Sequence, residues 1–236
     1  MLNLMMVDLV FPVYKDLKSL PKFNTQLSKD TFSVNKEIAL KNISFNYPNS
    51  EKTALKNISF NIPARNIVGI VGATGSGKTT IVNEVINLFD ASEICLLSSD
   101  SYYKNNASLD FNQRDKLNYD IPEAIDFDLL NKHIDSLKQE INIDVPNYCF
   151  TTHLRLEKTT VLEPKKILII EGILILTNKT LRDSINYSVF LDCPRDVRLQ
   201  RRLDRDIKER GRNYNDVINL FAVSYTHLTL PTSDLV

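Results

Sequence analysis

The chain has 236 residues, 43% hydrophobic and 25% charged, a length and composition typical of one α/β domain with a sizeable core and a small appendage. Basic and acidic residues balance at 29 each, which excludes a net field that would attract nucleic acid or an anionic membrane. Three scattered cysteines, Cys95, Cys149 and Cys193, favour reduced thiols, and no apolar run reaches the roughly 20 residues of a membrane span. We therefore expect a cytoplasmic protein, in which anion binding requires a local site.

The first part of the chain contains a near-repeat. The segment ALKNISFNYP at 39–48 returns as ALKNISFNIP at 54–63, and both copies carry the alternation and the Ile and Phe content of short strands. The residues between them, NSEKT at 49–53, are typical of a turn. Two copies are too few for a solenoid, so the repeat predicts an antiparallel β-hairpin.

From Asn66 onward, candidate strands alternate with candidate helices. The predicted strands cover 66–71, 93–98, part of 166–176 and 187–193, and the predicted helices cover 78–89, 125–139 and 194–210. The second of these helices is amphipathic, and its apolar side carries Ile125, Leu129, Leu130, Ile134 and Leu137. This alternation predicts an α/β fold with a mostly parallel sheet and helices on both faces.

A phosphate-binding loop, or P-loop, lies between the first predicted strand and the first predicted helix. Its residues fit the pattern G-x-x-x-x-G-K-[ST] and are Gly72, Ala73, Thr74, Gly75, Ser76, Gly77, Lys78 and Thr79, with Thr80 directly after. Glycines let backbone N–H groups surround a phosphate, and the following helix presents its positive N-terminus. Lys78 is expected to reach the β- and γ-phosphates, and Thr79 to offer its hydroxyl to Mg²⁺. A merely structural glycine turn is disfavoured, because four of the six glycines lie between 69 and 77.

Two acidic residues come directly after predicted buried strands. Glu171 follows KKILII, and Asp100 lies just past EICLLS. Ligands of open α/β sheets bind at the carboxyl ends of the strands, so both carboxylates are candidates for the metal or the acceptor. Each acid alone could equally be a solvated loop residue, but their paired placement favours a function.

Several ordered motifs downstream of the P-loop resemble the uridine kinase family. LLSSDSYYK at 96–104 is similar to a family stretch whose aspartate is the base for the ribose 5′-hydroxyl, which implies this role for Asp100 and a nucleoside contact for Tyr103. LNYDIPEAIDFDLL at 117–130 resembles a stretch whose first aspartate contacts the ribose, which implies this role for Asp120.

Two further motifs extend the same resemblance. VPNYCFTTHLR at 145–155 resembles a segment whose tyrosine and histidine hold the pyrimidine, which implies these roles for Tyr148 and His153. IIEGILIL at 169–176 is similar to a family strand with a metal-site glutamate, which implies this role for Glu171.

The arginine-rich helix carries the last of these motifs. RLQRRLDRDIKERGR at 198–212 resembles a family segment whose arginines bind phosphates, which implies this role for Arg202, Arg205, Arg210 and Arg212. The arginines that share one helix face are Arg195, Arg198, Arg202 and Arg205. Such a stripe suits triphosphate neutralisation, although the alternative is a solvated face that nearby acids partly neutralise: Asp196, Asp204, Asp206 and Glu209.

The resemblance covers about 79–221 and departs from the family pattern at two positions. Ile121 stands where histidine is usual, and Cys149 stands where aspartate is usual. It implies phosphorylation of uridine or cytidine in pyrimidine salvage, with ATP or GTP and Mg²⁺, no nucleic acid or membrane partner, and a possible homo-oligomer. Lys78, Mg²⁺ and the arginines would neutralise the γ-phosphate while Asp100 accepts the proton of the hydroxyl.

A second resemblance covers 37–80, which is similar to the start of an ABC transporter ATPase domain, with Tyr47 at the position that stacks on adenine. The chain has no LSGGQ signature, because it contains no adjacent glycine pair. Two alternatives to the kinase therefore remain: an ATP-binding fragment of an ABC transporter, and an inactive chimeric gene product.

The last residues, 223–236, break the strand–helix pattern. Residues 223–232, VSYTHLTLPT, resemble a translated transposase-type sequencing adapter, so we exclude the tail and His227 from functional reasoning. The sequence then predicts three parts. They are an ABC-like segment with the hairpin at 1–65, a P-loop kinase-like domain at 66–222 that is incomplete at its C-terminus, and a non-native tail at 223–236.

Overall fold

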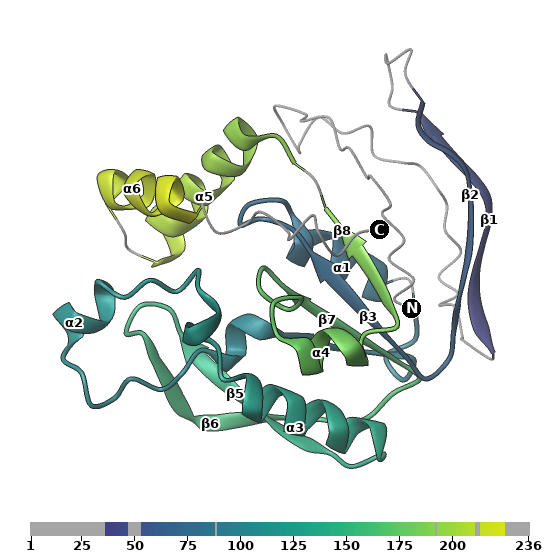
Figure 1. The fold of residues 1–236 in the computed structure, drawn as a ribbon, viewed down its shortest axis with the longest axis horizontal. Helices are drawn as coiled ribbons and strands as arrows, with labels where there is room; N and C mark the ends of the chain where they lie inside the picture. Colours follow the sequence, from purple (N-terminus) through teal and green to yellow (C-terminus); the bar gives the residue numbers. More distant parts are fainter. Residues whose placement is uncertain (1–35, 47–52, 88, 192, 211–212, 225–236) are drawn as a thin grey trace.

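A computed structural model shows the arrangement of the elements (Figure 1). The structure describes residues 36–46, 53–87, 89–191, 193–210 and 213–224. The predicted turn between the two near-repeats and nearly all of the adapter-like tail lie outside the described residues.

A parallel sheet of four strands forms the centre of the molecule. Its order is β4 (Ile94–Ser98), β7 (Ile167–Gly172), β3 (Asn66–Val71) and β8 (Tyr187–Phe190). Each neighbouring pair is parallel, which confirms the prediction of an α/β fold with a mostly parallel sheet. The strands are short apolar runs rich in β-branched residues, as strands buried on both faces require.

Alternate residues of each central strand enter two separate apolar cores, because side chains in a strand point to opposite faces. On one face, Val68 and Ile70 of β3 pack in a cluster with Val82 of α1 (Lys78–Asn87). On the other face, Ile67 belongs to a larger cluster that includes the apolar side of α3. Helices therefore cover both faces, as predicted.

The second core depends on two helices with side-chain caps. In α3 (Phe127–Lys138), Asp126 accepts a hydrogen bond from the backbone N–H of Leu129. In α4 (Lys179–Ser184), Asn178 does the same for Leu181. Such caps satisfy N–H groups that the first helical turn leaves without partners. The predicted apolar side of α3 is confirmed, since Leu130, Ile134 and Leu137 are buried.

A second antiparallel hairpin, β5 (Ile143–Cys149) and β6 (Leu154–Leu162), packs beside η1 and α3, and no predicted element covered it. Pro146 lies within β5, and proline ordinarily weakens a strand assignment because it cannot donate to the ladder. The exposed face of β6 also lacks a regular apolar alternation. These features hid the hairpin from pattern analysis.

Short helical segments complete the kinase-like part. They are η1 (Ser99–Tyr102), α2 (Phe111–Asp115), η2 (Pro122–Ala124), α5 (Arg195–Arg210) and α6 (Tyr214–Ser224). The predicted arginine-rich helix corresponds to α5. The helix α6 packs against α5 and runs two residues into the segment predicted as the tail, within the usual uncertainty of a helix end.

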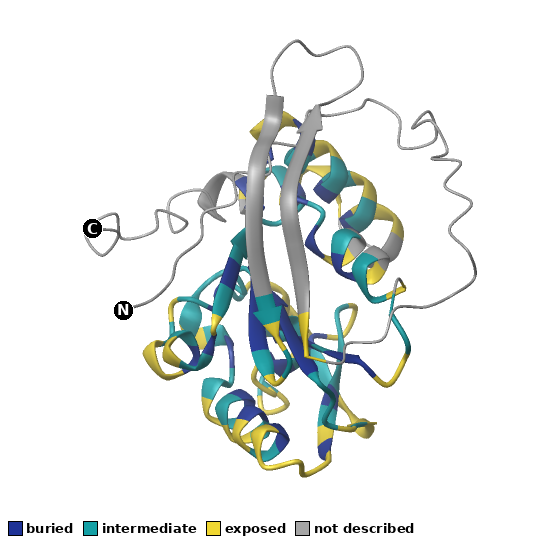
Figure 2. Cartoon of the chain, turned by 90° about the vertical axis from the view of Figure 1, so that its right-hand side faces the viewer, coloured by how far each residue is buried: buried dark blue, intermediate teal, exposed yellow. Residues whose placement is uncertain are grey.

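The near-repeats form β1 (Glu37–Asn46) and β2 (Thr53–Pro63), an antiparallel pair that makes a sheet of its own, as predicted. Tyr47 lies outside the described residues. Buried residues concentrate in the central sheet and on the inward faces of the helices (Figure 2). Among the helices that the structure describes, none combines the length and apolar character needed to cross a bilayer.

Candidate active site

The P-loop turns sharply between β3 and α1, and two of its glycines adopt backbone angles that other residues avoid. Gly75 has φ +84° and Gly77 has φ +93°. A Cβ on Gly75 would also lie 2.4 Å from the backbone oxygen of Arg198. Both the left-handed conformation and the close approach of α5 therefore require glycine at this position.

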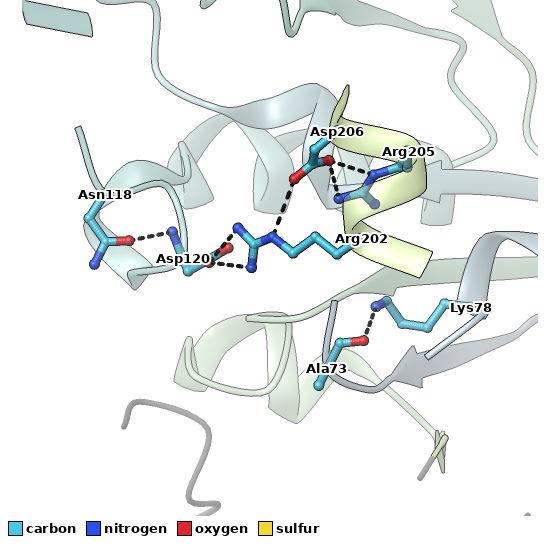
Figure 3. Close-up of polar contacts among 7 residues, drawn as sticks. All are labelled: Ala73, Lys78, Asn118, Asp120, Arg202, Arg205 and Asp206. Carbon is cyan, nitrogen blue, oxygen red and sulfur yellow. Dashed lines mark hydrogen bonds and ion pairs between the residues drawn. The ribbon is translucent and has the colours of Figure 1, made fainter. Parts of the chain in front are cut away.

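The side chain of Lys78 lies against the backbone of this loop. Its Nζ donates to the backbone oxygens of Gly72, at 2.8 Å, and Ala73, at 3.3 Å, and the residue is only 8% exposed (Figure 3). Burial lowers the pKa of Lys78, while the charges of Glu171 and Asp100 oppose that shift. The ammonium group thus lies among the loop carbonyls and within the electrostatic reach of both carboxylates.

The two acids predicted at strand ends lie at the same edge of the sheet. Glu171 is the penultimate residue of β7 and accepts a hydrogen bond of 2.9 Å from the Ser98 hydroxyl of β4, and its carboxylate is 3.4 Å from the Thr79 hydroxyl. Burial raises the pKa of Glu171, and the nearby charge of Asp100 adds to this effect. Thr79 and Glu171 are therefore in contact, and Asp100 lies close enough for its charge to act on Glu171 and Lys78.

A pocket next to this edge contains every residue predicted to contact the nucleoside. Its lining is Tyr103, Leu117, Asn118, Tyr119, Asp120, Tyr148, Phe150, His153, Arg202 and Asp206. The lining comes from four separate parts of the chain: the end of η1, the loop before η2, the tip of the β5–β6 hairpin, and α5.

Aromatic rings belong to five of the ten residues that line this pocket. Tyr119 stacks on His153 with ring centroids 4.9 Å apart and planes 12° apart, and Tyr103 meets Tyr119 edge-on at 5.3 Å. His153 has φ +56°, and its backbone N–H donates to the carbonyl of Cys149 at 2.8 Å, so the tight hairpin turn aims the imidazole inward. Flat apolar walls of this kind suit a planar ring.

Tyr148 brings a buried polar atom to the pocket. Its hydroxyl forms no hydrogen bond of ordinary geometry with the residues that the structure describes, although the Tyr119 side chain lies close to it. Burial raises the pKa of Tyr148, and the neighbouring Tyr119 adds to this effect, so the phenol stays neutral. A buried hydroxyl without a partner is costly, and a polar ligand atom would remove that cost.

Charged residues close the pocket on the side of α5 (Figure 3). Both Nη atoms of Arg202 lie 3.3 Å from Asp120 Oδ2, and its Nε donates to Asp206 Oδ2 at 3.3 Å. Arg205 donates through Nε to Asp206 Oδ1 at 2.9 Å. Asp206 is only 1% exposed, so the alternative of a solvated acid on this helix is wrong for this residue.

The prediction of one arginine stripe facing the phosphates is wrong in part. The guanidinium groups of Arg195 and Arg198 lie over the ring of Phe221 in α6, at 5.8 and 5.6 Å from its centroid. Arg201, which the stripe omitted, places its guanidinium at the P-loop, with Nη1 3.4 Å from the carbonyl of Gly75. The packing of α6 against α5 determines which arginines of α5 contact α6 and which contact the P-loop. The sequence of α5 alone does not contain this information.

Three predicted phosphate ligands are not described in enough detail to be placed. The side chains of Thr80 and Arg210 and all of Arg212 lie outside the described part of the chain. Two residues that the sequence analysis missed, Tyr119 and Phe150, line the pocket. Their signal was available, because each is an aromatic residue within two positions of a predicted ligand, Asp120 or Tyr148.

Arg155 of β6 was also missed. It donates to the backbone oxygens of Tyr103, at 2.8 Å, and Tyr102, at 3.2 Å, and it pairs with Asp126 at 3.0 Å. These contacts attach the hairpin to the turn that carries Asp100. A basic residue in a strand gave no sign of this role.

The parallel sheet, the glycine-rich loop with its lysine and the acids at the strand ends define a P-loop kinase fold. The family model "Phosphoribulokinase / Uridine kinase family" matches residues 67–228. Uridine kinases of Staphylococcus haemolyticus and Clostridium tetani are each 44% identical to this chain over 155 residues. These alignments cover 66% of this chain and, in the same order, 75% and 74% of the relatives.

A solved structure agrees at the level of the fold. A protein of Silicibacter sp. TM1040, proposed to be a fructose transport system kinase, has 22% identity and a TM-score of 0.56, covering 69% of this chain and 84% of that one. The chain belongs to the phosphoribulokinase/uridine kinase family. The family match begins twelve residues before the expected start at 79 and so includes β3 and the P-loop.

Proposed function

We propose that this kinase transfers the γ-phosphoryl group of ATP to the 5′-hydroxyl of uridine or cytidine. The observation that carries the proposal is the position of the aromatic pocket beside the P-loop lysine. Figure 3 shows Lys78 in the same part of the site as Arg202 and Asp120, which line the pocket. Burial lowers the pKa of Lys78, and the charge of Asp120 also acts on it. The uridine kinases to which the chain is similar support the same substrate class.

The roles follow from the chemistry of the side chains. Asp100 accepts the proton of the acceptor hydroxyl, while Lys78, Arg202 and Arg205 neutralise the charge of the transferred group. The backbone N–H groups of the P-loop hold the triphosphate at the N-terminus of α1. In the pocket, Tyr148 and His153 hold the base, and Asp120 binds the ribose.

The residues at the edge of the sheet also suit Mg²⁺. The hydroxyl of Thr79 and the carboxylates of Glu171 and Asp100 are hard oxygen ligands of the kind that this ion prefers, and they lie together beside Lys78. These three residues would hold the ion, which would neutralise phosphate charge when it is bound.

The predicted division of the chain stays part of the proposal. The kinase domain covers 66–222, and the segment 1–65, with its separate hairpin, and the tail 223–236 lie outside it. We infer a cytoplasmic role in pyrimidine salvage for the domain.

The test is a steady-state assay of the purified 236-residue chain with ATP and MgCl₂. Uridine or cytidine should stimulate ADP release, and phosphorus NMR should identify the 5′-monophosphate as the product. Purine nucleosides serve as the matched control and should give little stimulation, and GTP in place of ATP defines the donor. ATP hydrolysis that no nucleoside stimulates would contradict the proposed function.

A further inference from the structure

The strongest feature that the proposed reaction leaves without a role is the buried carboxylate of Asp206. It lies on α5, is 1% exposed, and faces two arginines that the proposed reaction uses. Carboxylates are almost never buried to this degree unless they are paired. Its burial therefore calls for a specific reason.

Each oxygen of Asp206 holds a different arginine. Oδ2 accepts from Nε of Arg202 at 3.3 Å, and Oδ1 lies 2.9 Å from both Nε and Nη2 of Arg205 (Figure 3). The second contact is bidentate from the arginine side, an arrangement that fixes the guanidinium plane as well as its position. One buried group thus sets the orientation of two cations.

The contact with Arg202 continues into the pocket. Because Nε of Arg202 is held by Asp206, its two Nη atoms extend to Asp120 Oδ2, at 3.3 Å each. Asp120 belongs to the loop before η2 and is far from α5 in the sequence, so Asp206, Arg202 and Asp120 connect two elements across the pocket. An arginine side chain is flexible, and without such an anchor it must lose its rotamer freedom each time the site forms.

A simple salt bridge within a helix is the ordinary alternative. Asp206 and Arg202 have the i, i+4 spacing, and exposed pairs with that spacing contribute little. Asp204 and Lys208 on the same helix illustrate that case, with atoms 3.8 Å apart and both side chains more than half exposed. Asp206 differs because it is buried, holds two arginines and lines the nucleoside pocket.

We propose that Asp206 is a positioning residue for phosphoryl transfer, which acts by orienting Arg205 toward the phosphate site and Arg202 toward Asp120. This inference rests on the proposed nucleoside kinase function. Asp206 does not touch the reacting atoms, so its effect must pass through the two arginines.

The test compares Asp206→Asn with Asp204→Asn, which removes the same charge from an exposed position of the same helix. We expect Asp206→Asn to lower kcat by about 10- to 100-fold, as a displacement of catalytic groups by about 1 Å does, while Asp204→Asn stays within about twofold of the wild type. The deciding measurement is a double-mutant cycle with Arg205→Gln. Because part of the effect passes through Arg202, adding Asp206→Asn to Arg205→Gln should still lower kcat, but by a smaller factor than Asp206→Asn does in the wild-type background.

Each outcome decides the inference. The inference would be overturned if the losses of kcat in the two single variants multiplied in full in the double variant, or if Asp206→Asn left kcat unchanged. In either case the wild-type assay would still support the kinase function. A second variant, Asp206→Glu, keeps the charge and should fold with a partial loss of kcat. If neither variant folds while Arg205→Gln folds, the role of Asp206 is structural and the inference is wrong. A wild type without nucleoside-stimulated turnover would instead contradict the proposed function.

Discussion

The P-loop and the aromatic pocket of this kinase, the proposed phosphate and nucleoside sites, are encoded in different ways. The phosphate site is one run of eight consecutive residues, 72–79, in which glycines fix the backbone and Lys78 supplies the charge. The pocket is assembled from separate segments around Tyr103, Tyr119, Tyr148 and Arg202. The first can be read from a local pattern, whereas the second exists only once the hairpin β5–β6 and the helix α5 have packed.

The two regions also differ in what stabilises them. At the phosphate site, charged groups are buried together, so the pKa of Lys78 is lowered and that of Glu171 is raised. In the pocket, aromatic rings pack on one another and leave the Tyr148 hydroxyl without a described partner. Perturbed ionisable groups suit chemistry, and an apolar wall with a few polar atoms suits recognition.

The largest change in activity is expected when Asp100, the proposed general base, is replaced. Asp100→Asn should lower kcat by about 10² to 10⁴-fold, because it removes the proposed general base. Binding of ATP in the absence of Mg²⁺, measured by calorimetry, should stay near the wild-type value, since the P-loop and Lys78 are unchanged. Asp135→Asn, an exposed acid paired with Lys138 at 3.9 Å, is the matched control. Near-normal turnover of the Asp100 variant would contradict the assignment.

A smaller effect should be confined to the pocket. Tyr148→Phe removes a hydroxyl that has no described partner in the folded protein, so the melting temperature should not fall. If that hydroxyl binds the base, the KM for uridine should rise about tenfold, the equivalent of about 1.4 kcal/mol, with the KM for ATP unchanged. The exposed Tyr214→Phe provides the control. An unchanged KM for uridine would mean that Tyr148 only fills space.

The smallest effect concerns the charge buried at the phosphate site. Because the folded-state pKa of Glu171 lies above its ordinary value of 4.5, the folded protein binds this proton more tightly than the unfolded chain does. The resulting stability is present below pH 4.5 and is lost as the pH rises through the folded-state pKa.

Glu171→Gln imitates the protonated carboxyl group, so this variant should not lose stability as the pH rises. We expect its melting temperature to exceed that of the wild type at pH 7, and the difference to shrink at pH 4. Thermal melts at both pH values measure this, with Glu163→Gln as an exposed control. A difference that is larger at pH 4 than at pH 7 would refute the prediction.

Two features of the fold escaped the sequence analysis for different reasons. The helical periodicity placed Arg195 and Arg198 on a common face with Arg202, which is correct for an isolated helix. The structure instead packs Phe221 of α6 against Arg195 and Arg198, so only part of that face reaches the site. The hairpin β5–β6 was missed because Pro146 and an exposed outer strand obscure its pattern.

The sequence by itself determined the fold class, the P-loop and the acids at the strand ends, and it predicted four of the residues that line the pocket: Tyr103, Asp120, Tyr148 and His153. These features rest on local rules: hydrophobic periodicity, the backbone freedom of glycine and the order of motifs along the chain. Only the tertiary structure decided that Asp206 is buried between Arg202 and Arg205, and that Arg155 attaches the hairpin to the turn with Asp100. Burial and ion pairing depend on which elements meet in space, and a linear pattern does not contain that information.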